Sequence, residues 1–270
     1  MNVTIITGGS DGIGAEMARR LAAKDKAGLG LVLAGRSQEK LDAVAAQCRT
    51  QGTEVLTVAM DVGVEAQCRE LIAKTVERFG RIDTLVNNAG ISAQANFADV
   101  KAHDLHWYMD LMQVNLWGAV WCTHEALPHI KQARGRIVAV GSLAGLIGVP
   151  GRTAYSATKF AMTGFFEALR AELKPAGVSV TIAYPGAVDT QLRYRGFNAQ
   201  GRPAGSSGLK EDDMMPVEEC GRLIVEGMER RQRDVVMTAK GKVGRFIKLL
   251  APGVVEAMAL KALKEEVRPR

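Results

Sequence analysis

The sequence has few cysteines and no long apolar run, and both absences limit what the protein can be. The four cysteines show neither CxxC spacing nor histidine partners at metal-ligand distance. We therefore predict reduced thiols, no metal site and a cytoplasmic location. No stretch of about 18 apolar residues occurs, so no segment is predicted to span a bilayer. The first residues lack the basic and then apolar regions of a secretion signal, which argues against export or an N-terminal anchor.

The sequence also lacks a linker rich in proline, glycine and serine within its first 190 residues. A single domain is therefore predicted for residues 1–240 of the 270-residue chain. Residues 241–270 are predicted to form a helical extension that packs on the domain or on a partner subunit. The 29 glycines, about one residue in nine, exceed the usual share of about 7%. This excess favours tight turns or a backbone that approaches a ligand closely.

The net charge of +6 comes almost entirely from one segment. Residues 230–248 contain seven lysines and arginines against one acid, Asp234. These basic residues lack interleaved aromatic side chains and any nucleic-acid-binding motif, so nucleic-acid binding is not predicted. Together with the apolar residues that follow, the segment allows contact with a membrane surface. Packing against protein is the more frequent arrangement and is favoured here.

Apolar segments typical of strands alternate with segments of helical periodicity. This alternation predicts a doubly wound, mainly parallel sheet of seven strands with helices on both faces, the Rossmann-type α/β arrangement. Because the first five strand segments are nearly continuous apolar runs, both faces of the sheet are expected to be covered. The predicted strands are residues 3–7, 29–35, 54–60, 82–87, 135–142, 178–185 and 234–239. The predicted helices are residues 14–24, 38–48, 65–80, 105–130, 154–173 and 253–264.

The alternating pattern breaks after Thr190. Residues 191–215 are rich in glycine, proline, serine and charge. A long segment of this kind at this place predicts a mobile lid over a substrate, with an insertion of no function as the alternative.

The first strand-to-helix turn is rich in glycine. Residues 3–7 are followed directly by GGSDGIG and then by a predicted helix. Glycines there allow a tight turn and a close approach to a pyrophosphate, whose charge is met by the N–H groups at the positive end of the helix. The turn therefore predicts a dinucleotide site. The residues predicted to contact the dinucleotide are Gly8, Ser10, Asp11, Gly12, Ile13 and Gly14.

The second strand ends without the acid that a site for NAD would carry. An acid about 20 residues after the glycine turn binds the ribose of NAD. Here the strand is followed instead by Arg36 and Ser37. Because a guanidinium suits a 2′-phosphate, NADP(H) is predicted in preference to NAD(H). The alternative is that Arg36 lies in solvent at the edge of the sheet.

Tyr155 and Lys159 stand four residues apart in a predicted helix, and Ser142 precedes them at the end of a predicted strand. Free tyrosine and lysine both titrate near 10, so moving the phenol toward 7 requires roughly 4 kcal/mol of preferential stabilisation of the phenolate. A lysine four residues on lies on the same helical face and can supply part of it. Taken alone, such a pair is more often a surface tyrosine beside a solvated lysine.

Six motifs occur in a characteristic order. They are TGGSDGIG (7–14), NNAG (87–90), Asn115, Ser142, YSATK (155–159) and YPGAVDT (184–190). With these motifs the chain resembles the classical short-chain dehydrogenase/reductase family, closely over about residues 1–190 and loosely over residues 216–240. Any one motif is weak evidence, whereas six in register across one α/β pattern are specific.

The resemblance implies roles for the matching positions. Tyr155 is expected to act as general acid or base, Lys159 to hold its pKa down and bind the nicotinamide ribose, and Ser142 to polarise the substrate carbonyl. Asn115 is expected to extend the proton relay through a water. In isolation, Ser142 fits a hydroxyl that satisfies strand-end backbone equally well, and Asn115 a buried amide at a helix kink. The other cofactor contacts implied are Asp61, Val62, Asn88, Ala89, Gly90, Pro185, Gly186, Val188 and Thr190.

The predicted function is that of an NADP(H)-dependent oxidoreductase that acts on a largely hydrophobic substrate. It would reduce a ketone or aldehyde, or oxidise a secondary alcohol. The substrate is expected between Ser142, Tyr155 and the lid, while Arg193 and Arg195 in the lid leave room for an anionic tail. The residues expected near the substrate are Ser92, Leu143 and either Trp107 or Tyr108.

Other functions and the state of assembly remain open at this point. The resemblance implies a homodimer or homotetramer that associates through residues 105–130 and 154–173. One alternative function is an NADP(H)-binding sensor without catalysis, which would not need Asn115, Ser142 and the Tyr155–Lys159 pair together. Another is an epimerase or dehydratase, which usually has a longer chain and a different glycine spacing.

Overall fold

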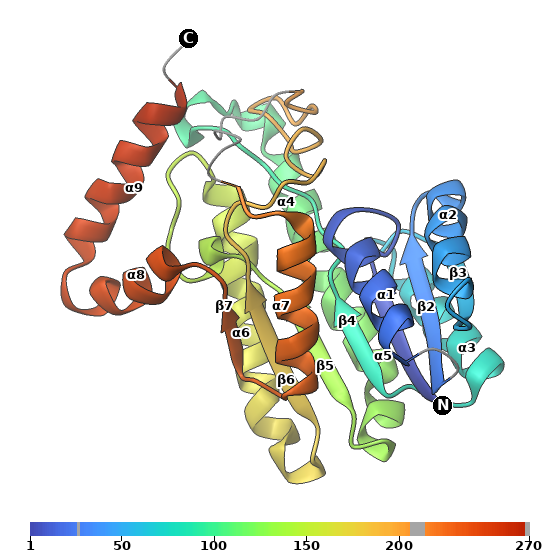
Figure 1. The fold of residues 1–270 in the computed structure, drawn as a ribbon. Coiled ribbons are helices and arrows are strands. Elements are labelled where there is room, and N and C mark those ends of the chain that lie inside the picture. Colours follow the sequence, from blue (N-terminus) through green and yellow to red (C-terminus); the bar gives the residue numbers. More distant parts are fainter. Residues whose placement is uncertain (26–27, 206–213, 268–270) are drawn as a thin grey trace.

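The computed structural model describes residues 1–25, 28–205 and 214–267 (Figure 1). Residues 206–213 of the predicted lid and residues 268–270 of the predicted extension lie outside the described residues. The strands form one parallel sheet in the order β3-β2-β1-β4-β5-β6-β7, which confirms the predicted fold class. Their bounds are β1 Asn2–Thr7, β2 Leu29–Gly35, β3 Glu54–Ala59, β4 Thr84–Asn87, β5 Arg136–Val140, β6 Ser179–Tyr184 and β7 Asp234–Val236.

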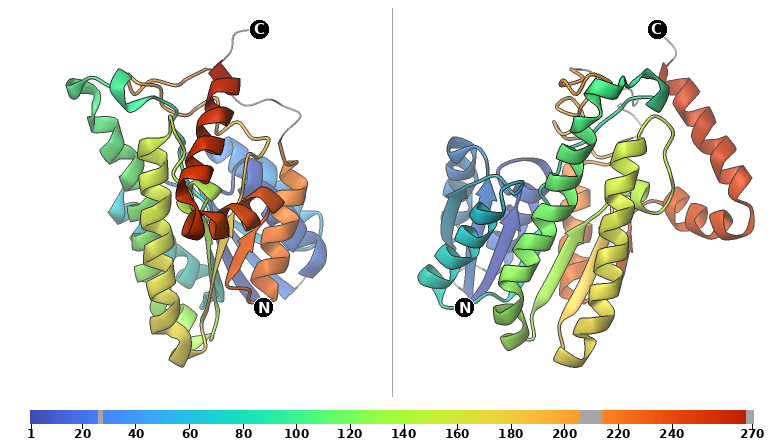
Figure 2. Two further views of the ribbon diagram at one scale, coloured as in Figure 1. Left: turned by 90° about the vertical axis from the view of Figure 1, so that its left-hand side faces the viewer. Right: turned by 180° about the vertical axis from the view of Figure 1, so that it is seen from behind.

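The main helices cover both faces of the sheet (Figure 1, Figure 2). On one face α1, α2 and α7 pack against the strands, and on the other α3, α5 and α6 do so. The bounds are α1 Gly12–Asp25, α2 Gln38–Arg49, α3 Glu65–Phe79, α4 His106–Met112, α5 Gly118–Gln132, α6 Thr153–Leu173, α7 Val217–Glu229, α8 Ala239–Leu250 and α9 Pro252–Val267.

The strand side chains alternate between two apolar cores. Ile5 of β1 lies in the core beneath α3, α5 and α6, whereas its neighbour Ile6 lies in the core beneath α1, α2 and α7. Val32 and Leu33 of β2 divide in the same way. Because successive side chains of a strand point to opposite faces, a strand covered on both faces must be apolar throughout. The continuous apolar runs of the sequence have this cause.

The end of the chain differs from the sequence-based prediction. The seventh strand was predicted over residues 234–239, but β7 ends at Val236, and the Thr238 hydroxyl accepts a hydrogen bond from Gly241 N at 2.9 Å as the cap of α8. Helix α7 was not predicted, whereas most of α8 lies within residues 241–270, which were predicted to be helical. For α7 a signal was present, because its buried apolar residues recur at helical spacing. They are Cys220, Ile224, Val225 and Met228.

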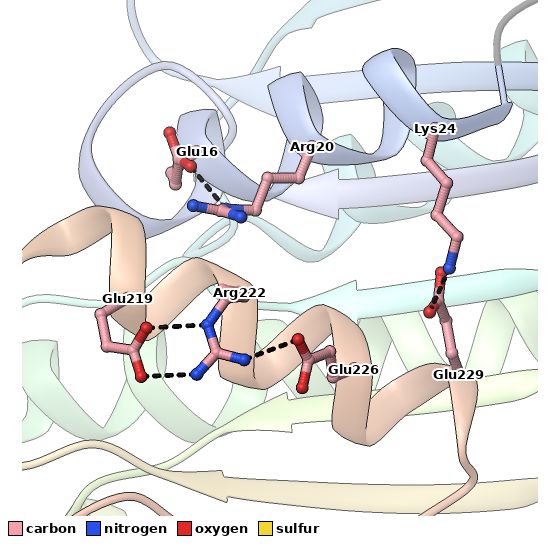
Figure 3. Close-up of polar contacts among 7 residues, drawn as sticks. All are labelled: Glu16, Arg20, Lys24, Glu219, Arg222, Glu226 and Glu229. Carbon is pink, nitrogen blue, oxygen red and sulfur yellow. Dashed lines mark hydrogen bonds and ion pairs between the residues drawn. The ribbon is translucent and has the colours of Figure 1, made fainter.

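Helix α7 packs on α1, the helix that begins at the glycine-rich turn (Figure 3). Most of the ion pairs drawn there lie within one helix, such as Arg20 with Glu16 on α1. One pair joins the two helices, with Lys24 Nζ at 2.6 Å from Glu229 Oε2. Where the two helices meet, Gly221 of α7 leaves room for the side chain of Glu16 on α1. A Cβ at Gly221 would lie 2.6 Å from Glu16 Cγ.

The last two helices, α8 and α9, stand out from the body of the domain beyond β7 (Figure 2). Helix α8 is tied to the domain by Lys248, whose Nζ donates to the Leu146 carbonyl at 2.8 Å and lies 4.6 Å from the ring centroid of Phe160. Its far side exposes Leu249 and Leu250, at 79% and 88%. Among the described residues, no helix combines the length and apolar character needed to cross a membrane.

Candidate active site

A cavity of about 980 Å³ opens at the carboxyl ends of the strands. The strand order reverses between β1 and β4, and in a doubly wound sheet the crevice at such a switch point is where ligands bind. Most of the sequence-predicted residues line this cavity. They are Gly8, Ser10, Asp11, Gly12, Ile13, Arg36, Asp61, Val62, Asn88, Ala89, Gly90, Ser142, Tyr155, Lys159, Pro185, Gly186, Val188 and Thr190. Gly14, Ser37 and Asn115 are not part of its lining.

The glycine-rich turn leads from β1 into the N-terminus of α1 with a backbone that requires glycine. Gly8 and Gly12 have φ of +67° and +50°, in the region that side chains rarely adopt. Gly14 supports the turn from behind, since a Cβ there would lie 2.6 Å from Asn88 Nδ2. The Asn88 amide in turn donates to the carbonyls of Thr7 and Gly8 at 3.0 and 3.2 Å. The ends of β1 and β4 are thus held together beneath the N-terminus of α1, the part of a helix that suits a pyrophosphate.

The ends of β2 and β3 form the next part of the wall. Arg36 is exposed and lines the cavity, and no ion pair to it occurs among the described residues. Ser37 has a structural task, because its hydroxyl caps α2 by accepting from Lys40 N at 3.4 Å. The Asp61 carboxylate accepts from Gly63 N at 2.8 Å, which fixes the turn after β3.

Ser142, Tyr155 and Lys159 meet where β5 and α6 approach each other. Ser142 follows β5, and its hydroxyl accepts a hydrogen bond from Ala144 N at 3.2 Å. The four-residue spacing puts Tyr155 and Lys159 on one face of α6. Lys159 Nζ donates to the Val140 carbonyl at 2.9 Å and lies 5.7 Å from the ring centroid of Tyr155. The three side chains therefore line one end of the cavity.

Burial is the main influence on the protonation of Tyr155 and Lys159. Burial raises the pKa of Tyr155, against the opposing effects of a hydrogen bond with Ser142 and the positive charge of Arg152. Burial also lowers the pKa of Lys159 to about 8. The Lys159 ammonium is bound to the Val140 carbonyl, and Arg152 is a cation that acts on the Tyr155 pKa. The role of Lys159 in lowering that pKa stays a prediction.

Asn115 lies in a π-helical segment, Gln113–Trp117, between α4 and α5. Asn115 is fully buried, and its side-chain amide forms two hydrogen bonds with the backbone of Ile91. Asn115 Oδ1 accepts from Ile91 N at 2.8 Å, and Asn115 Nδ2 donates to Ile91 O at 3.0 Å. The amide also donates to Thr158 Oγ1 at 3.0 Å. These contacts tie the segment after β4 to α6, close to Tyr155. The relay role of Asn115 stays a prediction.

The segment after β6 closes the cavity toward the lid. Leu143 N donates to the Pro185 carbonyl at 2.9 Å, which joins the ends of β5 and β6. Val188 forms an isolated parallel bridge with Met215, so the two ends of the lid lie side by side. A Cβ at Gly12 would lie 3.2 Å from Thr190 Cγ2. The start of the lid is therefore next to the glycine-rich turn.

The substrate side of the cavity contains residues that the sequence did not reveal. Ser92 and Leu143 line it as expected, whereas Trp107 and Tyr108 are not part of the lining and pack in an apolar cluster that shares Phe197 with it. Arg152 also lines the cavity and was not predicted. No sequence motif marks this residue; its proximity to the predicted Tyr155, three positions on, is the signal that was available.

Residues 2–200 match the family model described as short chain dehydrogenase. An Arabidopsis thaliana protein named 11-beta-hydroxysteroid dehydrogenase-like 4A is 43% identical over 188 residues, which are 69% of this chain and 61% of that protein. The chain thus spans about three fifths of that relative's length. A Sesamum indicum protein named 11-beta-hydroxysteroid dehydrogenase A is 35% identical over 260 residues, 94% of this chain and 73% of the relative.

Solved structures give the same result. An alcohol dehydrogenase from the archaeon Thermococcus sibiricus, complexed with 5-hydroxy-NADP, superimposes with a TM-score of 0.75 at 25% identity and covers 88% of this chain and 96% of its own. A short chain dehydrogenase/reductase from Burkholderia phymatum in complex with NAD has the same fold, with a TM-score of 0.78 at 24% identity and 94% of each chain covered. The motifs, the sheet order and the extent of the family match together show that this chain belongs to the short-chain dehydrogenase family of oxidoreductases.

Proposed function

We propose that the protein is an NADP(H)-dependent oxidoreductase that interconverts a carbonyl and a secondary or primary alcohol on a largely hydrophobic substrate. The observation that supports this most directly is the single cavity shared by the glycine-rich turn and by Ser142, Tyr155 and Lys159. The names of the Arabidopsis and Sesamum relatives refer to hydroxysteroids, which are hydrophobic secondary alcohols.

The proposed chemistry needs a proton donor next to the reacting oxygen. When bound, the nicotinamide cofactor supplies the hydride. Because the pKa of Tyr155 is raised, the phenol is protonated at neutral pH and suits a general acid in carbonyl reduction. The Ser142 hydroxyl donates a second hydrogen bond to the oxygen on which negative charge develops. Lys159, held against the Val140 carbonyl, is placed to bind the ribose hydroxyls of the cofactor.

The residues present fit a dinucleotide with a 2′-phosphate. The turn at Gly8 and Gly12 accepts a pyrophosphate, and Arg36 lines the cavity with no ion-pair partner among the described residues. We expect NADPH to bind more tightly than NADH, since a guanidinium and a phosphate form a strong bidentate pair. Titration of the protein fluorescence with each cofactor measures this, and Arg36→Leu should weaken NADPH selectively. Equal affinities for the two cofactors would refute NADP(H) preference.

The role of Tyr155 is tested by Tyr155→Phe in the presence of NADPH and a panel of aldehydes and ketones. Removing one general acid is expected to lower kcat by about 10²–10⁴-fold. The Kd for NADPH should stay within a few-fold, because the ring remains in place. Tyr194→Phe, which removes the hydroxyl of a tyrosine outside the cavity lining, is the matched control and should retain far more activity. Near-normal turnover by Tyr155→Phe would contradict the mechanism.

A second outcome of the same measurements would favour a different function. Tight binding of NADPH without oxidation by any carbonyl of the panel would favour the NADP(H)-binding sensor. An enzyme is preferred because Ser142, Tyr155, Lys159 and Asn115 occur together around one end of the cavity, which a sensor does not require.

We further propose that the protein is a cytoplasmic homodimer or homotetramer. The four cysteines are buried and unpaired, which suits a reducing compartment. Peripheral membrane contact through the basic segment 230–248 is not favoured. Three of its cations are engaged within the protein. Lys248 donates to the Leu146 carbonyl, Arg231 donates to the Arg134 carbonyl at 2.8 Å, and Arg245 Nη1 lies 3.8 Å from Asp234 Oδ2.

A further inference from the structure

The substrate side of the cavity holds an arginine without a carboxylate partner. Arg152 immediately precedes α6 and lines the cavity together with Ser92 and Val149. Its Nη2 lies 3.2 Å from Gln94 Oε1 and its Nη1 3.5 Å from Ser92 Oγ, both neutral acceptors. No acidic side chain of the described residues forms an ion pair with it.

The backbone around Arg152 is fixed from two sides, so the guanidinium has a defined position. Arg152 N donates to the Val149 carbonyl at 3.0 Å, and Ser156 N donates to the Arg152 carbonyl at 2.8 Å. The segment after β4 is hydrogen-bonded to the residue before Arg152, because Ala95 N donates to the Gly151 carbonyl at 2.8 Å. The side chain is half-buried between these segments. The site is therefore built into the wall of the cavity.

The charges around the cavity are unevenly distributed. Of the acids that line it, Asp11 and Asp61 follow β1 and β3 on the cofactor side. Asp110 belongs to the same side, because it lies one helical turn before Gln113, whose Nε2 donates to the Gly63 carbonyl at 2.6 Å. The described lining of the substrate side thus provides Arg152 and the lid arginines Arg193 and Arg195, but no acid.

The two lid arginines have other partners within the protein, whereas the hydrogen-bond partners of Arg152 are neutral. Arg195 Nη2 lies 3.4 Å from Asp11 Oδ2, so part of its charge is compensated within the protein. Arg193 has its guanidinium 5.9 Å from the ring centroid of Tyr194. The charge of Arg152 also acts at the catalytic end, because it opposes the rise that burial causes in the Tyr155 pKa. A half-buried arginine with only neutral hydrogen-bond partners has a strong preference for an anion.

We propose that Arg152 binds an anionic group, a carboxylate or a phosphate, carried by the substrate itself. This inference rests on the proposed function and gives it a substrate class: a carbonyl compound or alcohol with a hydrophobic body and a negative charge on the side away from the nicotinamide. The apolar part of the lining suits the body. It consists of Ile91, Leu143, Val149, Leu192, Phe197 and Pro203.

The test compares matched acids and esters. Aryl aldehydes with a para substituent are offered with saturating NADPH as the carboxylate, its methyl ester and the corresponding phosphate monoester. The wild type should prefer an anion over the ester in kcat/KM by about tenfold or more, the effect of one charge-assisted hydrogen bond. Whether the carboxylate or the phosphate is preferred identifies the anion.

Two variants separate charge from structure. Arg152→Gln keeps a hydrogen-bonding group but removes the charge. The ratio of kcat/KM for the anion to that for the ester should fall close to one, because the KM for the anions rises. The kcat/KM for the ester should change by no more than a few-fold. Arg152→Lys should restore part of the preference for the anion. The control Arg202→Gln removes an exposed lid arginine outside the cavity lining and should leave the preference unchanged.

Binding is also measured without turnover, by calorimetry of acid and ester with the NADP⁺-loaded protein. Equal affinity for acid and ester in the wild type, or an equal loss of both in Arg152→Gln, would overturn the inference while leaving the proposed function intact. Reduction of none of the aldehydes would count against the proposed function, and tighter binding of the acid by wild type than by Arg152→Gln would still support the anion site.

Discussion

Lys159 is 5% exposed, and its ammonium is hydrogen-bonded to a backbone carbonyl with no carboxylate partner among the described side chains. Burying a cation in this way costs free energy, and the cost appears as a pKa lowered by desolvation to about 8 from 10.5. Because the folded protein binds this proton more weakly than the unfolded chain, the contribution of Lys159 to the free energy of unfolding is lowest below pH 8. It rises between about pH 8 and 10.5 and levels off above that range.

Lys159→Met should therefore stabilise the fold while abolishing activity. At pH 7 the charge removed is worth about 3 kcal/mol, less about 1 kcal/mol for the lost hydrogen bond to the Val140 carbonyl. The gain over wild type should shrink by about 2 kcal/mol between pH 7 and pH 9.5, since wild-type Lys159 loses its proton over that range. Urea denaturation of both proteins at the two pH values measures the change. A gain that is the same at both would show that burial of the charge is not the cause.

Individual site residues differ in how far the sequence predicts them. Tyr155, Lys159 and Ser142 could be placed together because a four-residue spacing fixes two positions on a helix and a strand end fixes the third. Arg152 could not, because its place in the wall depends on a contact with the segment after β4, about 60 positions earlier in the chain. The effect of burial on the Tyr155 pKa likewise depends on packing that no motif reports.

At the scale of whole elements, the parallel strands were the most predictable part. A strand covered on both faces must be apolar throughout, and the first five predicted strands have this signature. The seventh was placed too long because the apolar residues beyond Val236 continue without a break, and the hydroxyl of Thr238 then begins α8. Where the sheet ends depends on which hydrogen bonds a residue finds in three dimensions, and periodicity alone does not contain this information.

The contact between α1 and α7 depends on a glycine, and two helical glycines make this testable. At Gly221 a Cβ would lie 2.6 Å from Glu16 Cγ, whereas at Gly164 of α6 nothing lies within 4 Å. Gly164→Ala should raise the free energy of unfolding by about 0.5–1 kcal/mol through helix propensity. Gly221→Ala should lower it by about 1–3 kcal/mol, because the helices must separate or Glu16 must move. Urea denaturation of the two variants measures both changes. An equal gain in the free energy of unfolding for both variants would show that α7 does not pack this closely on α1.

At the scale of the whole molecule, several large apolar side chains are exposed on the described part of the chain, and two groups of them bear on assembly. One lies on α4 and the π-helical segment after it, with Met109 and Trp117 at 70% and 48% exposure. The other lies on the outer side of α8, with Leu249 and Leu250. Large apolar side chains gathered on one face favour contact with another protein surface. The proposed association through residues 105–130 and 154–173 would cover the first group.

Trp117→Lys should therefore reduce the mass of the assembly in solution. Trp117 stands beside Trp121, with ring centroids 6.0 Å apart, and a lysine in an apolar contact between subunits would leave an unpaired charge there. Light scattering coupled to size-exclusion chromatography measures the mass, and circular dichroism checks that the variant is folded. Leu250→Lys, on the outer side of α8, is the matched control and should leave the mass unchanged. A monomeric wild type would contradict the proposed assembly, and a loss of mass in Leu250→Lys alone would assign the contact to α8 instead.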